Sequence, residues 1–410
     1  MPNGDLAMAG IGIITPIVLL VTAFSALVGF GGSPRVAIKM GQKDNDGAEE
    51  ILGNSFSLVI IIGLILTVFY IFKEPIVMAF GASKNTAQYA IDYLSIYLIG
   101  TVFVQVAVGM NPYINTQGFT TIGMITVAIG AGLNIILDPI LIFGFNMGIK
   151  GAAVGTVICQ LFICAWSTYY FTLGKSNLKL RLKYIRLNKK LLKLIIAIAL
   201  TPLFMELAAG SIHLVTNKVL KSYGGDLSIG AMTTVTSISL MFLMPIFGLS
   251  QGMQTIIAYN HGAKQHKRAR KTLFLGIIYG TIVLFIAFML VQLFPKLFVG
   301  IFTKDKTLMN MAVEGIRINL LTLPIVGISV LGAVYFQSVG EAKKSMFLSL
   351  LRQVILLVPM MLILPKFLGL NGVWFAQPTA DVISCIVTFI IVRKEIISHR
   401  SESDDSESVA

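Results

Sequence analysis

The chain has 410 residues, of which 56% are hydrophobic and only 12% are charged, and its mean hydropathy is +0.84. Soluble domains carry about 25% charged residues, so this composition excludes a water-soluble enzyme, a disordered protein and a disulfide-stapled domain. The formal net charge of +13 could suggest nucleic-acid binding, but the basic residues lie in short loops between apolar runs. That distribution is typical of membrane proteins, so no nucleic-acid partner is expected.

Eleven apolar stretches are long enough to cross a bilayer as helices, which predicts an all-α, polytopic membrane protein. They lie near residues 6–31, 51–72, 89–114, 120–145, 150–173, 191–217, 227–250, 272–294, 311–336, 345–366 and 371–392. The first stretch lacks the short apolar core and cleavage site of a signal peptide and is therefore counted as a span. The end of the chain, 393–410, is acidic and rich in serine, which predicts a disordered tail.

The distribution of basic residues predicts the orientation of these spans. With a cytoplasmic C-terminus, 21 of the 32 Lys and Arg residues lie on the cytoplasmic side and 9 lie on the other. Because cytoplasmic loops carry an excess of Lys and Arg, we expect the C-terminus to be cytoplasmic.

The sequence also repeats itself at an offset of 221 or 222 residues, and this repeat predicts the domain organisation. Glycines and lysines in loops coincide, which chance similarity between apolar helices does not explain. The coincident pairs include Gly41/Gly262, Lys43/Lys264, Gly118/Gly340, Gly148/Gly369 and Gly151/Gly372. The prediction is an N-terminal lobe of five spans (1–173), a cytoplasmic linker (174–190), a C-terminal lobe of six spans (191–392) and the tail (393–410).

The two lobes are expected to be pseudo-symmetric. Six spans per repeat would place both lobes in the same orientation, related by an axis along the membrane normal, with a cavity between them. The counterpart of 191–217 would precede Gly4, where the chain begins. Eleven spans with a cytoplasmic C-terminus also leave Met1 outside. Both arguments predict that the first helix of a twelve-helix protein is missing.

No catalytic or nucleotide-binding pattern is found in the sequence. A GxxxxGK[ST] loop, an HExxH motif and a serine–histidine–acid arrangement are all absent, so an enzyme is not expected, and no cofactor is expected either. Cys159, Cys164 and Cys385 lie in apolar runs and favour helix packing over a disulfide or a metal site. Gly151-Ala-Ala-Val-Gly155 is a stripe of small residues suited to close helix packing.

Attention therefore turns to ionisable groups at membrane depth, which are costly and mark transport pathways. Asp138 is followed by Pro139, which leaves a backbone carbonyl unpaired, and Asn134 lies one turn earlier on the same helix face. A carboxylate, an amide and a loosened backbone together suit a proton or a desolvated cation. The alternative is a buried aspartate neutralised by a neighbouring helix.

Further polar residues lie near the middle of other spans. Glu206 follows Pro202, and Asp381 follows Pro378; the repeat partner of Asp381 is Gln160. For these three residues a structural and a functional role both stay open.

Two arginines lie within spans. Arg352 is expected to extend towards the cytoplasmic water, and Arg317 to pair with Glu314.

Several segments together resemble the multidrug and toxic compound extrusion (MATE) transporters, and the resemblance covers essentially the whole chain. They are Gly29-Phe-Gly-Gly-Ser-Pro-Arg35 with Gly41-Gln-Lys43, Asn134-Ile-Ile-Leu-Asp-Pro-Ile-Leu-Ile142, Gly148-Ile-Lys-Gly-Ala-Ala153, Pro245-Ile-Phe-Gly-Leu-Ser-Gln-Gly252, Gly369-Leu-Asn-Gly-Val-Trp374 and Pro378-Thr-Ala-Asp381. The resemblance implies a twelve-helix exporter that trades sodium ions or protons for cationic, amphipathic compounds. It also implies that Asp138 matches the fifth-helix aspartate tied to ion coupling. The chain departs from the family pattern at the first helix, which in many members carries a further functional acid.

The function expected from the sequence is therefore secondary active multidrug efflux from the cell membrane. The site is expected to comprise Asp138, Asn134, Gln160, Glu206 and Asp381, with Na+ or H+ as the coupling ion. The expected partners are small cationic substrates and membrane lipids, and the expected state is a monomer. A lipid-linked oligosaccharide flippase of similar architecture and an inactive truncated transporter stay open as alternatives.

Overall fold

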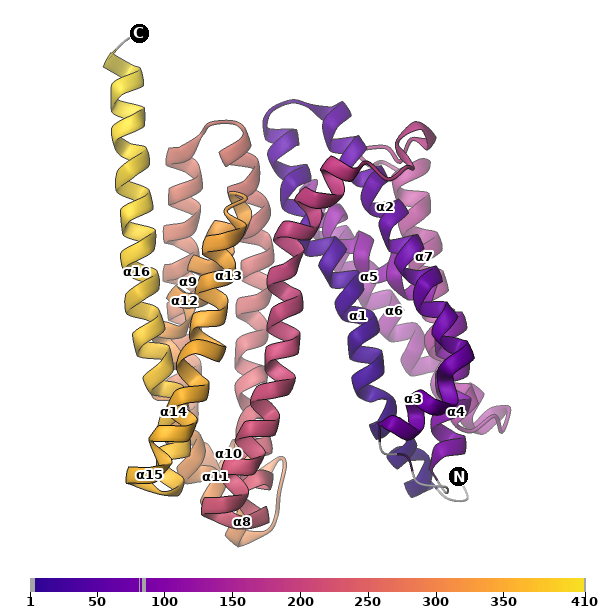
Figure 1. Ribbon diagram of the computed structural model, residues 1–410, viewed down its shortest axis with the longest axis vertical. Helices are drawn as coiled ribbons and strands as arrows, with labels where there is room; N and C mark the ends of the chain where they lie inside the picture. The colour runs from indigo at the N-terminus through magenta and orange to yellow at the C-terminus, as the bar shows by residue number, and fades with distance from the viewer. Residues whose placement is uncertain (1–3, 81, 83–85, 409–410) are drawn as a thin grey trace. The chain divides into compact units, whose positions relative to one another are not determined.

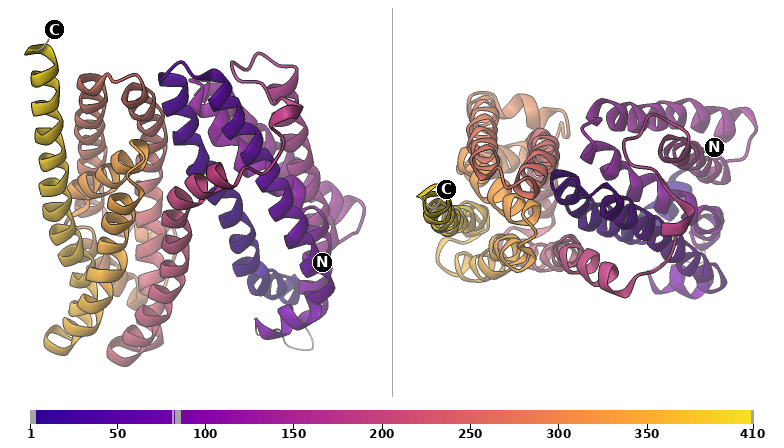
Figure 2. Two further views of the ribbon diagram at one scale, coloured as in Figure 1. Left: turned by 45° about the horizontal axis from the view of Figure 1, so that its top comes forward. Right: turned by 90° about the horizontal axis from the view of Figure 1, so that it is seen from above.

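The structure is a computed structural model of the chain and describes the backbone of residues 4–80, 82 and 86–408. Some side chains within helices lie outside the described set: those of 4–9, 190, 194, 197–211, 213–214, 226 and 396–408. Contacts divide the chain into two compact units, Met1–Leu203 and Phe204–Ala410. Every regular element in the described residues is helical (Figures 1 and 2).

The first unit consists of helices joined by short connections. Its elements are α1 (Gly4–Gly41), α2 (Asn45–Val68), η1 (Phe69–Phe72), α3 (Lys73–Ala79), α4 (Ala87–Ile99), α5 (Thr101–Thr116), α6 (Thr120–Pro139), the π-helix η2 (Ile140–Gly144), α7 (Ile149–Thr172), η3 (Leu182–Tyr184) and the start of α8 (Lys189–Gly262). Helix α1 packs against α2, α4 and α5, and α7 packs against α4, α5 and α6.

The second unit takes up the rest of the chain. After α8 come α9 (His266–Leu293), α10 (Pro295–Gly300), α11 (Lys306–Asn319), α12 (Leu323–Ser338), α13 (Ala342–Leu350), the π-helix η4 (Leu351–Leu356), α14 (Leu357–Ile363), α15 (Pro365–Leu368) and α16 (Leu370–Ser408). Helix α8 is two helices joined at Gly225, whose φ of 68° is left-handed. The Ser228 hydroxyl donates to the carbonyls of Leu220 and Gly225 and so satisfies backbone groups at the break.

Multiple helices are long and apolar enough to cross a membrane, which confirms the prediction of a multi-pass membrane protein. Among the described residues there are 8 such helices, or up to 10 if each of two bent pairs is one span. These ten overlap ten of the eleven stretches expected from the sequence. The remaining stretch, 191–217, lies largely outside the described side chains, so the count of eleven stays a prediction.

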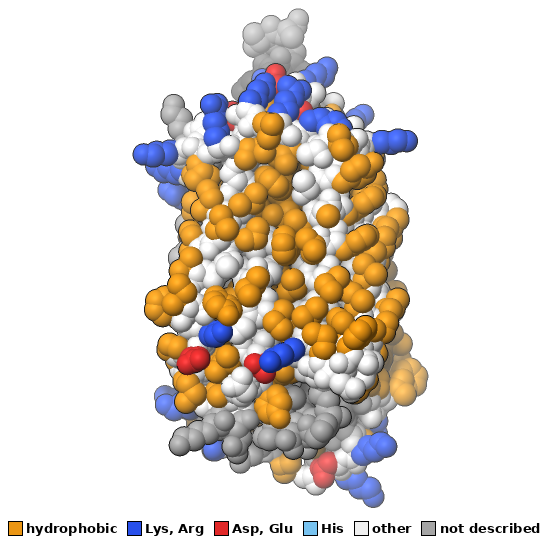
Figure 3. Space-filling view, turned by 90° about the vertical axis from the view of Figure 1, so that its right-hand side faces the viewer, with side chains coloured by type: hydrophobic (Ala, Val, Ile, Leu, Met, Phe, Trp, Pro, Cys, Tyr) orange, Lys and Arg blue, Asp and Glu red, His pale blue; other side chains and the backbone are white. Residues whose placement is uncertain are grey.

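Apolar side chains form a broad band across the face of the first unit in Figure 3, with basic side chains gathered above it.

The repeat found in the sequence recurs in the backbone of the two units. Lys43 and Lys264 both have left-handed φ, at 60° and 59°. The glycine pairs match as closely, with φ of 87° and 86° at Gly118 and Gly340, and of 59° and 57° at Gly148 and Gly369. Left-handed φ is strained for most residues and is adopted most easily by glycine. The same residue type with the same φ at matching positions therefore indicates that the chain turns in the same way in both units. The prediction of two pseudo-symmetric halves is therefore confirmed at the level of backbone geometry.

The bent spans match in the same way. Helices α4 and α5 meet at an angle of 61° on either side of Gly100, and α11 and α12 meet at 57°. Both units also contain a π-helix close to a proline: η2 follows Pro139, and η4 precedes Pro359. Single-turn π segments are frequent at functional sites, which directs attention to these two places.

The expected linker lies folded against the start of α2 within the first unit. Arg181 Nε lies 2.7 Å from the buried Glu49 carboxylate, and the Lys179 amide donates to the same carboxylate at 3.0 Å. The backbone N–H of Asn188 donates to Asn54 Oδ1 at 2.6 Å.

At the other end of the chain, α16 continues helically to Ser408. The side chains beyond 395 are outside the described set, so the lobe boundaries and the disordered tail stay predictions.

Two matched glycines permit the backbones of neighbouring segments to approach closely. A Cβ atom at Gly151 would lie 2.7 Å from the backbone carbon of Leu141, and one at Gly372 would collide with the backbone of Leu364 and Pro365. We therefore expect Gly151→Ala and Gly372→Ala each to destabilise the protein by about 1–3 kcal/mol, because backbone cannot move aside as a flexible side chain can. Thermal unfolding in detergent measures the change.

The matched control for these variants is Gly252→Ala on α8, where an added Cβ meets nothing within 4 Å. This helical position should be neutral or slightly stabilised, because alanine is the better helix former. An unfolding midpoint for Gly372→Ala equal to that of the Gly252→Ala protein would contradict the packing argument.

Candidate functional site

The first candidate site lies at the end of α6, where Asn134 and Asp138 meet as the sequence predicts. Asn134 Nδ2 donates to Asp138 Oδ1 at 3.0 Å. Both side chains are half-buried, whereas Ile135 and Ile136 between them are 73% and 59% exposed. Among the described residues no partner is found for the second carboxylate oxygen of Asp138. One oxygen is therefore held by an amide, and the other can accept a proton or a cation.

The backbone beside this carboxylate departs from the α-helix. Pro139 has no N–H to donate, and the chain widens directly after it into the π-helix η2. The Phe145 amide closes this wider turn by donating to the Ile140 carbonyl at 2.9 Å. The loosened backbone expected from Pro139 is therefore present as a π turn.

Helix α7 supplies the wall against which Asp138 lies. A Cβ atom placed on Gly155 would lie only 2.5 Å from Asp138 Oδ1, so the carboxylate approaches the α7 backbone at a position without a side chain. The Cys159 thiol, one turn further along α7, lies beside the Asn134 amide and in the field of Asp138. Gly155 therefore does more than permit helix packing, and its spacing from Cys159 (Gly155-x-x-x-Cys159), which places both on one face of α7, indicates this in the sequence.

A tyrosine of α4 completes the surroundings of this carboxylate. The Tyr93 hydroxyl lies 3.5 Å from Thr156 Oγ1 on α7 and interacts electrostatically with Asp138. The α6–α7 site therefore comprises a carboxylate, an amide, a thiol and a phenol within one unit. These groups can hold a proton or coordinate a cation.

Of the other predicted residues, Gln160 lies in the first unit, and Glu206 and Asp381 lie in the second. Gln160 lies next to Cys159 on α7, and its carbonyl oxygen is buried with no hydrogen-bond partner among the described residues. Among the described residues, no contact joins Gln160 to Asp138. Glu206 lies on α8, and its side chain is outside the described set.

Asp381 forms a second, separate site in the second unit. It is 4% exposed and accepts hydrogen bonds from Gln377 Nε2 at 2.9 Å and from Thr322 Oγ1 at 3.3 Å. Arg352 Nε lies 3.4 Å from Asp381 Oδ1, and the Arg352 side chain is only 16% exposed. The expectation that Arg352 extends to water is therefore wrong, because η4, which contains Arg352, packs against α16 and places the guanidinium beside Asp381.

The other intramembrane arginine also differs from expectation. Arg317 and Glu314 are both exposed, and the Arg317 guanidinium donates to the Gln292 carbonyl at 3.4 Å. The predicted Glu314–Arg317 pair is not found among the ion pairs of the described residues. In the first unit Asp92 lies 3.5 Å from Lys150, as its position near the end of a span allows.

The first unit also contains an apolar cavity of about 670 Å³. Residues of α1, α2 and α4 line most of it, and its aromatic members are Phe24, Phe69 and Phe80. No ionisable side chain is found among its described lining residues, and none of the five predicted site residues is either. A cavity of this character accepts the apolar part of a ligand.

Comparison of the chain with known proteins identifies its family. The MatE family model matches residues 1–140 and 202–363, which is more than half of the chain. The chain belongs to the MATE family. The resemblance inferred from the sequence motifs is therefore confirmed, and the chain is grouped with transporters.

Relatives and solved structures agree with this placement over most of the chain. The multidrug export protein MepA of Staphylococcus aureus (strain MRSA252) is 27% identical over 406 residues, covering 98% of this chain and 88% of MepA. A solved structure of the MATE multidrug transporter DinF-BH has a TM-score of 0.87 and 33% identity, covering 96% of this chain and 88% of that one. A MATE crystal structure in the bent conformation has a TM-score of 0.93 at 22% identity, covering 98% and 90% of the two chains.

The packing of Asp138 against Gly155 gives a direct test of this MATE site. We expect Gly155→Ala to displace the carboxylate and to reduce transport at least tenfold, while the protein still inserts and purifies normally. Efflux from cells, together with the amount of purified protein, measures the two effects separately. The matched control is Gly132→Ala on α6, where an added Cβ meets nothing within 4 Å. Equal transport by the two variants would contradict the site geometry.

Proposed function

We propose that this MATE chain is a secondary antiporter that exports cationic, amphipathic compounds in exchange for protons or sodium ions. The observation that carries the proposal is the Asp138 carboxylate, which has one oxygen bound by Asn134 and lies beside a π turn. Carboxylates at membrane depth are costly to keep and mark ion or substrate pathways. The names of the relatives, a multidrug export protein and a multidrug transporter, support export of several compounds.

The coupling follows from competition for one negative charge. A proton or a sodium ion neutralises Asp138, and so does a cationic substrate, so occupancy by one disfavours the other. Alternating access then lets the ion enter while the substrate leaves. The membrane potential supplies about 2.3 kcal/mol per unit charge per 100 mV, to which any ion gradient adds.

The apolar part of the substrate requires a different surface. The cavity of about 670 Å³ in the first unit lies within the range of about 300–1,000 Å³ typical of small-molecule pockets, and its lining is apolar and aromatic. We assign this cavity to the hydrophobic body of the exported compound. Asp138 does not line it, so the charged and apolar parts of the recognition are separate.

Orientation in the cell membrane follows from the basic loops. We place the C-terminus in the cytoplasm, because the side with most of the Lys and Arg residues is retained there. A lipid-linked oligosaccharide flippase would favour several cations at mid-depth. Arg352 is a mid-depth cation among the described residues, and its charge is compensated by Asp381. This arrangement supports the antiporter over the flippase.

Replacing the charged carboxyl tests the coupling role. We expect Asp138→Asn to reduce ion-driven efflux of a cationic dye to background in proteoliposomes, because an amide cannot bind a proton or compensate a cation. Membrane insertion and purification should be unchanged. An imposed pH gradient and an imposed sodium gradient, applied in separate experiments, identify the coupling ion.

Asp92→Asn is the matched control, since Asp92 lies near the end of its span and beside Lys150. It should retain most of the ion-driven efflux. Ion-coupled transport by Asp138→Asn at the level of Asp92→Asn would refute the assignment of Asp138.

A further inference from the structure

The second unit places a buried arginine and a buried aspartate opposite each other at membrane depth. Arg352 is ten residues from the start of α13, and Asp381 is eleven residues from the start of α16. At 1.5 Å per helical residue both lie about 15 Å from a helix end, which is halfway across the hydrocarbon core. A lone charge at that depth is strongly unfavourable, and each of these two groups compensates the other.

Two hydrogen bonds and one ion pair hold Asp381 without any mobile ion, and Arg352 Nε, 3.4 Å from Oδ1, contributes its charge and no hydrogen bond. Gln377, Thr322 and Arg352 reach it from α16, from the bend before α12 and from η4. The guanidinium therefore lies where a bound proton or cation would otherwise neutralise the carboxylate. In the first unit, by contrast, no described cationic side chain is found beside Asp138.

No other charged group of the described residues competes for Asp381. Cys385, one turn further along α16, interacts with it electrostatically. On the neighbouring elements, Glu314 and Arg317 of α11 and Lys366 of α15 are exposed. Glu341 just before α13, Lys343 of α13, and Arg393 and Lys394 of α16 are also exposed. Lys344 pairs with Glu395, Tyr335 interacts with Glu395 and Arg270, and the Glu206 side chain is not described.

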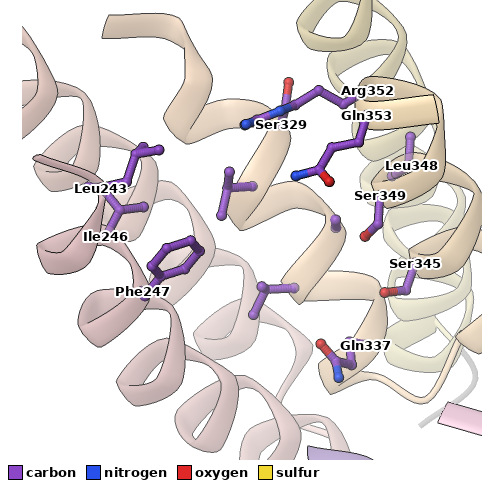
Figure 4. Close-up of a pocket in the computed structure, with 13 residues that line it drawn as sticks. Leu243, Ile246, Phe247, Ser329, Gln337, Ser345, Leu348, Ser349, Arg352 and Gln353 are labelled. Atoms are coloured by element: carbon purple, nitrogen blue, oxygen red, sulfur yellow. The ribbon is translucent and has the colours of Figure 1, made fainter. Parts of the chain in front are cut away.

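A small cavity of about 140 Å³ leads to this pair within the second unit. Figure 4 shows Arg352 and Ser329 at one end of the cavity and Gln337 at the other, with Ser345 and Ser349 along one side. The Ser329 hydroxyl is buried and has no hydrogen-bond partner among the described side chains and backbone. The lining is mostly apolar, but Arg352, Ser329 and Gln353 supply polar atoms at one end, so water molecules can be held there beside the guanidinium.

We infer that Arg352 is the resident cation of Asp381: it fills permanently the place that a coupling ion would take, so Asp381 binds no exchangeable cation. Ion exchange is then confined to sites outside this pair. The inference stands apart from the role proposed for Asp138, since it concerns only residues of the second unit.

Removing the guanidinium should convert the pair into an ion-responsive site. In Arg352→Gln the Asp381 carboxylate, the Gln377 carbonyl and the Thr322 hydroxyl are left without a cation. A proton or a sodium ion bound there then removes the uncompensated charge and stabilises the protein. Wild-type protein has no such requirement at this place.

The experiment measures the thermal unfolding midpoint in detergent, so it does not depend on transport or on Asp138. We expect Arg352→Gln to unfold several degrees below wild type at alkaline pH in N-methylglucamine. Acidification or added sodium should recover most of that loss. Arg352→Lys keeps the cation and should lose less. The double variant Arg352→Gln/Asp381→Asn should be more stable than either single variant and should show no more response to pH or sodium than wild type.

Two results would overturn the inference. One is a response of Arg352→Gln to pH and sodium that equals the wild-type response. The other is simple additivity of the two single substitutions, which would show that the residues are not coupled. If Arg352→Gln does not fold at all, rescue by Asp381→Asn supports the inference, and failure of that double variant to fold overturns it.

Discussion

The lack of water in the bilayer interior is the constraint on which the rest of this structure depends. Backbone groups there must find partners within the protein, so every departure from the α-helix needs its own compensation. The Phe145 amide closes the π turn after Pro139, and Ser228 satisfies the carbonyls at the break at Gly225. Each such departure has its own local solution, and the two π-helices, η2 and η4, lie at positions that do not correspond in the repeat. The same constraint governs side chains, and the two intramembrane aspartates meet it in different ways.

Asp138 and Asp381 differ in what compensates their charge. Asp138 is half-buried, receives one amide hydrogen bond and lies against the bare backbone of Gly155. Asp381 is buried, receives two hydrogen bonds and faces Arg352. Truncating one member of a buried ion pair leaves an uncompensated charge, so such a pair is costly to open. A partly compensated carboxylate can exchange its ligand, whereas a fully compensated one holds helices together. The difference assigns exchange to the first and rigidity to the second.

Much of this organisation could be predicted from the sequence, because the repeat is recorded in residues with special backbone requirements. Gly118/Gly340 and Gly148/Gly369 coincide in the sequence, and they coincide in φ. The Asn134–Asp138 contact was predictable too, since an i,i+4 pair on a helix meets whatever the tertiary fold. The Arg352–Asp381 pair was not, because its members lie on different elements. Arg352 belongs to η4 and Asp381 to α16, so only the packing of these two elements brings them together.

The polar residues of the two halves do not correspond to each other in the repeat. At the 221-residue offset Asp381 corresponds to Gln160, and Arg352 corresponds to Ala131. The arginine and the aspartate are thus present together in the second half and absent together from the first. Conversely, Asp138 and Asn134 correspond to Pro359 and Ile355, so their polar pair is also confined to one half. The two members of each polar pair lie in the same half, as expected because a charge or an amide left alone in hydrocarbon costs several kcal/mol. Pseudo-symmetry of the backbone therefore coexists with asymmetric chemistry: Asp381 faces a resident cation, whereas no described cation lies beside Asp138.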